Sequence, residues 1–402
     1  MSTQNVNPMW RHLVDFYFGA GTEPDPDFLA LVGEFDSVPD VRGRDIVLAI
    51  KAGRVDRHEI ERLLSTGRPV SADSPRELRS FFDHIDDVDS VIDLAAAARG
   101  AECLLSIPPT MLWANALILG ASYAGSDPRV SMAASINQKV MENSAKRFAE
   151  TAMYFRDMMI HGGYARPGRG VATSTRVRLV HSFVADVMNR DPDWPYPLYG
   201  TPVPMSATVW TGYVFGVMAL EYGQRYGLRF SARQKDDVAA YSAVTGYLMG
   251  GSRELLDHLR TYDAGTAFVR AYIERTPVPR DKDYQRLRGV LAGFFGTGGY
   301  PISENARLSR LFNRHLASRV RTAFGAEAAD TFGIPDNDAW SKSGDLVLGA
   351  VNTVLATCAR LPLTEATSAK LSKDFWLTSV PGIYAQITGK TSATFDDVVR
   401  AG

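Results

Sequence analysis

Histidines are the residues of this 402-residue chain with the clearest capacity for metal binding or acid–base chemistry. His181 stands out, because Val177 lies four residues before it and Val184 three residues after it, on the apolar face of a predicted helix. Such a histidine points into the interior, either as a core residue with one hydrogen bond or as an axial ligand of a heme iron. Most of the others are expected to be ordinary surface or boundary residues: His12, His58, His84, His161, His258 and His315.

A second group with chemical potential precedes His181 in the chain. Arg147 and Thr151 are four residues apart and share one face of a predicted helix, with Glu150 beside them. The group is either a solvated charged face or, since Phe148 and Phe155 flank it, a buried face toward the next helix. A buried arginine requires an acidic partner, such as a carboxylate or a heme propionate. Periodicity leaves both interpretations open.

The common catalytic signatures are absent from the sequence. It has no HExxH, GxxxxGK[ST] or GxSxG motif, and no GxGxxG between a strand and a helix. Gly296–Gly299 resembles a phosphate loop most closely, but it lacks the flanking strand and the lysine and is expected to be a turn. Cys103 and Cys358 are far apart in sequence, which predicts reduced structural thiols.

Long amphipathic helices must position these groups. Apolar residues at helical spacing predict one helix over 136–158 and another over 177–188, joined by a glycine-rich loop at Gly162–Gly170. Capping boxes are predicted at Ser74–Glu77, with a proline at the first helical position, and at Ser231–Gln234. Strand patterns are scarce. The expected fold class is therefore all-α.

Other segments have simpler interpretations. Five prolines between Asp191 and Pro204 predict an extended or turning segment. The apolar stretches Met111–Ala121 and Val209–Leu220 are too short to span a membrane and are expected to be buried core helices. Further helices are predicted over residues 1–70 and after about 340, from Asp338 onward.

The charge balance gives little help with partners. The chain has 44 basic and 45 acidic side chains, a formal net charge of −1, so charge supports neither nucleic acid nor an anionic membrane as a partner. Met1–His12 lacks the basic start and apolar stretch of a secretory signal, which makes the cytoplasm the expected compartment.

Several fragments, taken in order, resemble the rubber-oxygenase (latex-clearing protein) superfamily, which includes a fungal endoplasmic-reticulum oxygenase of mycophenolic acid synthesis. The resemblance covers roughly residues 70–340 and rests on the order and spacing of Lys146–Thr151, Gly162–Gly163, Arg176–His181, Gly200–Val203, Ala240–Gly250 and Asn313–Leu316.

The resemblance implies a globin-like helical core around heme b, with His181 as the iron ligand. It also implies that Arg147, Glu150 and Thr151 lie over the distal face as catalytic residues, and that Arg147, Thr151 and Arg178 contact the cofactor. The expected domains are a helical lead-in at 1–70, a heme-binding domain at 71–340 and a helical extension at 341–402.

Two residues depart from the family pattern. Glu150 replaces a lysine that can occupy the sixth iron site, and its carboxylate could instead shuttle protons, pair with Arg147 or leave the distal site open to water or dioxygen. Ala185, followed by Asp186, stands where the family tends to have arginine, which changes the support of the ligand helix.

The expected function is a heme b-dependent oxygenase that uses O2, with an unidentified electron donor as a further partner. Since no export sequence is apparent, rubber is not the expected substrate. The expected substrate is a small apolar, unsaturated metabolite of isoprenoid or polyketide type, and oxidative C=C cleavage is one possible outcome of the reaction. Its pocket is expected to involve Met153, Met158, Phe183 and Val184. The alternatives are a heme- or lipid-binding module without turnover and a heme-free helical protein.

Overall fold

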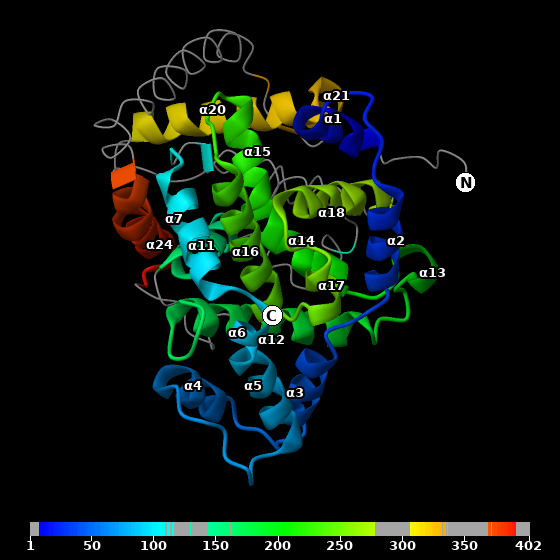
Figure 1. Cartoon of the computed structure of the whole chain (residues 1–402), viewed down its shortest axis with the longest axis vertical. Helices are drawn as coiled ribbons and strands as arrows, with labels where there is room; N and C mark the ends of the chain where they lie inside the picture. Colours follow the sequence, from blue (N-terminus) through cyan, green and yellow to red (C-terminus); the bar gives the residue numbers. More distant parts are fainter. Residues whose placement is uncertain are drawn as a thin grey trace.

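The chain is all-α, as predicted, in a computed structural model that describes residues 8–108, 111–112, 115, 129, 144–160, 163–277, 306–331, 333–334, 336, 369–370 and 372–390 (Figure 1). Within these ranges every regular element is a helix. In chain order the helices are α1 (Pro8–Phe18), α2 (Pro26–Phe35), α3 (Val41–Lys51), α4 (Arg57–Thr66), α5 (Arg76–Asp86), α6 (Val88–Val91), α7 (Leu94–Ser106), α11 (Ser144–Met159), α12 (Arg169–Met188), α13 (Tyr196–Tyr199), α14 (Met205–Phe215), α15 (Val217–Arg225), α16 (Ala232–Leu248), α17 (Arg253–Asp257), α18 (Tyr262–Arg275), α20 (Ala306–Phe324), α21 (Ala326–Thr331), the π-helix η1 (Phe375–Ser379) and α24 (Val380–Thr388).

Helix α16 forms the centre of the packing, with α7, α14, α15 and α12 against it (Figure 1). A Cβ at Gly100 of α7 would lie 2.1 Å from the carbonyl oxygen of Asp237, so only glycine permits this close helix approach. The helix begins with the predicted capping box: the Ser231 hydroxyl accepts from the Gln234 N–H, and the Gln234 side chain accepts from the Ser231 N–H. Ser242 and Thr245 donate to carbonyls one turn back, which satisfies hydroxyls buried in the core.

One hydrophobic core joins the two ends of the described chain. Leu13 near the start and Tyr384 near the end are buried in the same cluster as the residues of α16. A small separate cluster, Met188, Trp194 and Tyr199, lies under the proline-rich segment. The predicted domain boundaries at 70 and 340 stay predictions.

The predicted capping box at Ser74 is wrong. Helix α5 begins after Pro75 without a side-chain cap. Glu77 pairs with Arg54 (2.7 Å) instead of reaching back to Ser74, whose carbonyl accepts from the Arg79 side chain. A competing ion pair has therefore replaced the local contact that the motif predicted.

The predicted buried helix over Val209–Leu220 is two helices. Both are buried, but α14 ends at Phe215 and α15 begins at Val217. A Cβ at Gly216 would lie 1.9 Å from the Ser242 hydroxyl oxygen, so this break lets the chain pass close to α16. The predicted turning segment Asp191–Pro204 contains the single-turn helix α13, and the Trp194 indole N–H donates to the Gly200 carbonyl (2.8 Å).

Some sequence predictions fall outside the described residues. The helix predicted over 136–158 is observed from Ser144, and residues 130–143 lie outside. So do most of Met111–Ala121, the turn at Gly296–Gly299, Cys358 and the stretch that begins at Asp338. Cys103 is buried, and burial, reinforced by the charge of Asp237, raises the pKa of its thiol to about 12, as expected for a structural thiol.

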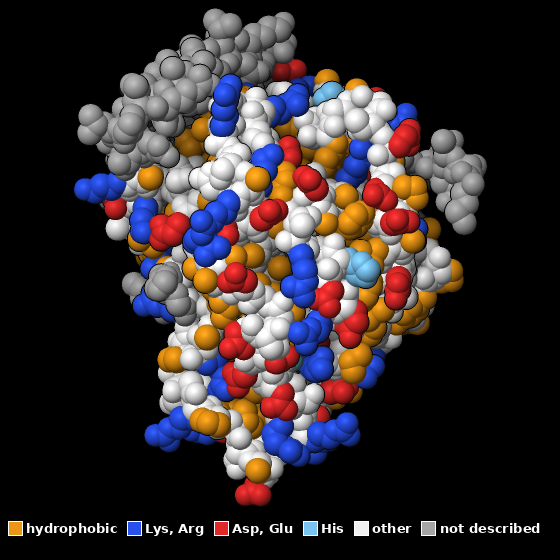
Figure 2. Space-filling model, in the orientation of Figure 1, with side chains coloured by type: hydrophobic (Ala, Val, Ile, Leu, Met, Phe, Trp, Pro, Cys, Tyr) orange, Lys and Arg blue, Asp and Glu red, His pale blue; other side chains and the backbone are white. Residues whose placement is uncertain are grey.

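The face drawn in Figure 2 carries acidic and basic side chains interspersed with one another. This mixture agrees with the near-zero net charge of the sequence. No helix in the described ranges is long and apolar enough to cross a membrane.

Candidate functional site

Helices α11 and α12 carry the predicted site residues and pack against each other. Near the turn that joins them, the Thr173 hydroxyl donates to the Asp157 carboxylate (3.0 Å), and the Ser174 hydroxyl contacts the Met158 sulfur (3.3 Å). The short connection makes the two helices antiparallel. The predicted loop Gly162–Gly170 ends two residues early, because α12 already begins at Arg169. A Cβ at Gly170 would lie 2.8 Å from the Gly163 carbonyl oxygen, so glycine lets this first turn pack on the loop.

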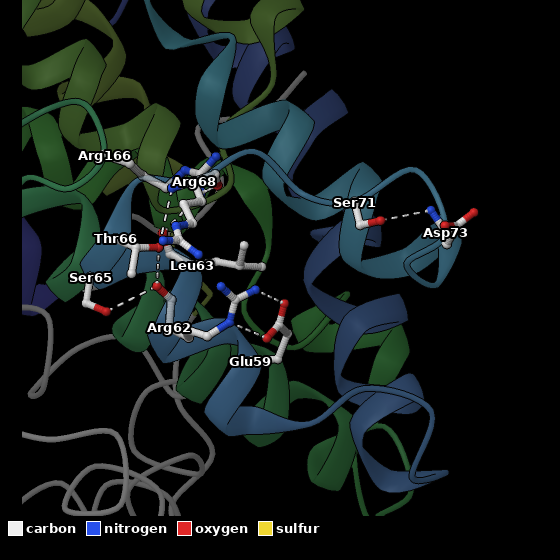
Figure 3. Close-up of polar contacts among 9 residues, drawn as sticks. All are labelled: Glu59, Arg62, Leu63, Ser65, Thr66, Arg68, Ser71, Asp73 and Arg166. Atoms are coloured by element: carbon white, nitrogen blue, oxygen red, sulfur yellow. Dashed lines mark hydrogen bonds and ion pairs between the residues drawn. The ribbon is translucent and has the colours of Figure 1, made fainter.

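Arg166 fixes that turn to the lower part of the molecule. Figure 3 shows its guanidinium at the C-terminal end of α4, where Nη1 donates to the carbonyls of Leu63 (3.1 Å) and Arg68 (2.8 Å). The same side chain pairs with Asp86 through Nε (2.7 Å) and lies over the Phe82 ring. It thereby adds hydrogen bonds to carbonyls at and just beyond the end of α4 and holds the start of α12 in place.

The helical register places His181 and Thr151 on the facing sides of the two helices. From the Ser174–Met158 contact, seven residues along α12 lead to His181, and seven residues back along α11 lead to Thr151. Each step is two turns, about 10.5 Å along a helix, so both residues keep the orientation of that contact.

His181 is half-buried, with its Nδ1 atom enclosed. Val177 and Val184, on the same side of α12, are also half-buried. The expectation that His181 points fully into the interior is therefore only partly correct: the histidine lies at the border of the core.

Of the other residues predicted to lie over the distal face, Glu150 has a described side chain and Arg147 does not. The Glu150 carboxylate lies 3.7 Å from the Lys146 ammonium, one turn earlier on α11. Arg147 belongs to α11, but its side chain lies outside the described part, so its predicted role is untested.

Thr151 also borders a mostly apolar cavity with an empty volume of about 480 Å³, part of which opens to solvent. The Phe155 ring of α11 stacks near the Phe215 ring of α14, with centroids 3.8 Å apart. The lining comes from α7, α11, α14, α16, η1 and the chain after α7: Leu104, Leu112, Asn115, Thr151, Ala152, Phe155, Met159, Phe215, Tyr241 and Trp376.

None of the four residues expected to line the pocket borders this cavity. Met158 is used in the α11–α12 contact, and Phe183 lies under the cations of Lys51 and Arg57 on the far side of α12. Apolar character identified these residues as candidates, but the side of each helix that faces the cavity depends on the tertiary packing.

Arg178 makes its described contacts with protein groups. Its Nε and Nη2 atoms donate to the Asp40 carboxylate at 2.6 and 2.8 Å, its side chain is 1% exposed, and it lies over the Phe81 ring. Burial opposes ionisation of Asp40, but Arg178 and the Gly43 N–H outweigh it and lower the pKa of that carboxyl. These contacts assign Arg178 a structural role, and its predicted cofactor contact remains untested.

Sequence reasoning missed His84 of α5. Its ring is buried, stacks on Tyr247 at 4.1 Å and has Nε2 3.0 Å from the Tyr247 carbonyl oxygen. Burial, reinforced by the nearby charge of Arg178, lowers the pKa of His84 to about 3. Helical spacing with Phe81 and Ile85 is the sequence feature that could have predicted its burial.

The donor set constrains what His181 can bind. Among the described residues, no three His, Cys, Asp or Glu side chains come together as they would around a bare metal ion. A single imidazole instead fits a metal whose other ligands come from a macrocycle, as in heme.

Known proteins resemble this chain in sequence and in fold. Residues 107–358 match the family model described as ER-bound oxygenase mpaB/B'/Rubber oxygenase, catalytic domain. The chain is 23% identical over 269 residues to the rubber oxygenase of Streptomyces sp. (strain K30), a match that covers 65% of this chain and 61% of that protein. The match thus spans about three-fifths of that relative's length.

A solved structure of latex clearing protein LCP in the closed state has a similar fold, with a TM-score of 0.59 and 18% sequence identity. The similarity covers 93% of this chain and 96% of that one. The family match covers more than half of the chain, so this protein belongs to the family of mpaB-type and rubber oxygenases.

Proposed function

We propose that this protein is a heme b-dependent oxygenase that acts with O2 on a small apolar, unsaturated molecule. The observation that carries the proposal is the register of α11 and α12, which puts one imidazole opposite a threonine at the edge of an apolar cavity. Membership of an oxygenase family supports the reaction class.

His181 would hold the iron through its ring nitrogen, and Thr151 with Arg147 would lie on the opposite side. When bound, heme supplies the redox chemistry that activates dioxygen, with an electron donor where the reaction needs one. The chain's own residues bind and orient the organic substrate: Phe155 and Phe215 supply apolar surface and exclude water.

Glu150 is proposed to take and return a proton at its carboxylate. Glu150 is next to Thr151 in α11, and Lys146 holds a positive charge near its carboxylate. Turnover by Glu150→Gln that equals turnover by the wild type would remove this role, because the amide cannot exchange a proton in the same way.

The alternative is a binding module without turnover. The same cavity and histidine would serve storage or sensing, and consumption of dioxygen with candidate alkenes separates the two functions. An oxygenase consumes O2 in proportion to substrate, whereas a binding module does not.

The first experiment is the visible absorption spectrum of the heme-supplemented protein beside His181→Ala, oxidised and reduced. We expect a Soret band in the wild type that is lost or shifted in the variant. His58→Ala is the matched control, because His58 is exposed on α4 and its loss should leave the band unchanged. Absence of a band in every protein would refute the heme assignment.

A further inference from the structure

Tyr241 of α16 is a buried cavity residue whose hydroxyl has no hydrogen-bond partner among the described residues. Its side chain is 0% exposed. The neighbouring Thr245 hydroxyl donates to the backbone carbonyl of Tyr241 (2.9 Å), so it satisfies the main chain of Tyr241. An unmade hydrogen bond at a buried hydroxyl is destabilising and rare in native proteins.

Other buried tyrosines of the core are satisfied by the protein. Tyr213 donates to the Leu259 carbonyl (2.8 Å), Tyr17 to the Asn115 side chain (2.9 Å) and Tyr164 to the Ala97 carbonyl (3.3 Å). The exception is therefore the tyrosine that borders the cavity.

The Tyr241 hydroxyl is a donor at neutral pH. Burial, reinforced by the neighbouring Tyr164 and Tyr154, raises the pKa of Tyr241, so the phenol keeps its proton. It can therefore donate to an oxygen or nitrogen acceptor.

The other residues that line the cavity limit the chemistry of the molecule that carries this acceptor. Leu104, Phe155, Met159 and Phe215 give it aliphatic and aromatic walls. The Asn115 amide is already engaged, since its oxygen accepts from Tyr17 and its nitrogen donates to the Val214 carbonyl. A molecule bound here must be mainly apolar, because a polar group that faces these aliphatic and aromatic walls would lose its hydrogen bonds to water without compensation.

We propose that the cavity binds a small apolar molecule with one hydrogen-bond acceptor, a carbonyl or ether oxygen, to which the Tyr241 hydroxyl donates. This inference rests on the proposed function in that the molecule is the substrate of the oxygenase. It makes the substrate an oxygen-bearing unsaturated chain, in contrast to a pure hydrocarbon. Tyr241 then determines substrate specificity, because it favours molecules that place an acceptor oxygen beside its hydroxyl.

The test compares two probes of equal length, geranylacetone and 2,6-dimethylundeca-2,6-diene, which lacks the ketone oxygen. Binding to the purified full chain is measured by equilibrium dialysis, without reference to absorption bands or turnover. We expect the wild type to bind the ketone more tightly, and Tyr241→Phe to weaken ketone binding on the order of 3- to 10-fold while leaving the diene unchanged.

Tyr213→Phe is the matched control. It removes a hydroxyl that donates to the Leu259 carbonyl, so its melting temperature should fall while its preference for the ketone stays. Tyr241→Phe should keep the melting temperature of the wild type, because no protein hydrogen bond is lost.

Equal affinity of the wild type for the two probes would overturn the inference, as would an undiminished ketone preference in Tyr241→Phe. A fall in the melting temperature of Tyr241→Phe as large as that of Tyr213→Phe would also overturn it, because it would reveal a protein acceptor. These results do not depend on the heme assignment. If the protein shows no Soret band but Tyr241→Phe still abolishes the preference for the ketone, the binding site stands and only the proposed oxygenase function is refuted.

Discussion

The two sides of α12 differ in how they are held. One, the anchored side, consists of Arg176 and Asp186, which pair with Glu61 of α4 and Lys51 of α3, and it is continued round the helix by Arg178, which pairs with Asp40 before α3. The other, the open side, consists of Val177, His181 and Val184, all half-buried. Charge pairs fix the position and rotation of the helix, so the residues of the open side, His181 among them, are held in a defined orientation.

The largest expected effect is on the anchored side. Arg178→Met should lower the free energy of unfolding by about 3 kcal/mol, because it leaves the Asp40 carboxylate without its cation in a largely buried place. Urea unfolding measures the loss. The double variant Asp40→Asn/Arg178→Met should recover part of it, since the asparagine can still cap α3. A loss below about 1 kcal/mol would contradict the anchoring role.

His84, beside Arg178, gives the anchored side a pH dependence. The unfolded histidine takes up a proton below about pH 6.5, whereas the folded one, with its pKa lowered to about 3, does not. The free energy of unfolding should therefore fall as pH drops from 6.5 to 4.5, with up to about 2 to 3 kcal/mol from His84. His84→Gln should remove that share of the slope in urea titrations at each pH. An identical slope in the variant would show that other groups cause it.

The smallest effect belongs to the open side. Val177→Ala should cost less than about 1 kcal/mol of unfolding free energy, since the residue is half-buried, whereas Val171→Ala, fully buried on the same helix, should cost about 2 kcal/mol. Thermal unfolding of the two variants compares them directly. Equal losses would mean that the open side is packed as tightly as the rest.

Local patterns predicted the helices better than the contacts between them. Apolar spacing predicted the helix of His181, and the capping box at Ser231 is present as predicted. The box at Ser74 failed because Arg54, distant in sequence, took its glutamate. Likewise the pairing of Arg178 with Asp40 joins residues 138 positions apart, and no local spacing encodes it.

The candidate site shows the same contrast between features that local patterns predict and features that depend on tertiary packing. His181 and Thr151 could be assigned to helices from the sequence, because each has neighbours at helical spacing, and their roles in the site stay predictions. The cavity could not be predicted in this way, since Leu104, Tyr241 and Trp376 meet only when α7, α16 and η1 are packed. The orphan hydroxyl of Tyr241 could not have been identified in advance, because a missing partner is a property of the folded surroundings.

The place of Trp376 in the cavity wall has a consequence for biosynthesis. Chains are made from the N-terminus, so α7, α11, α14 and α16 leave the ribosome well before η1 does. Until residue 376 emerges, the nascent cavity lacks one aromatic wall. During that interval the cavity is enclosed by fewer side chains than in the finished protein, and its wall is completed only when η1 packs against the earlier helices.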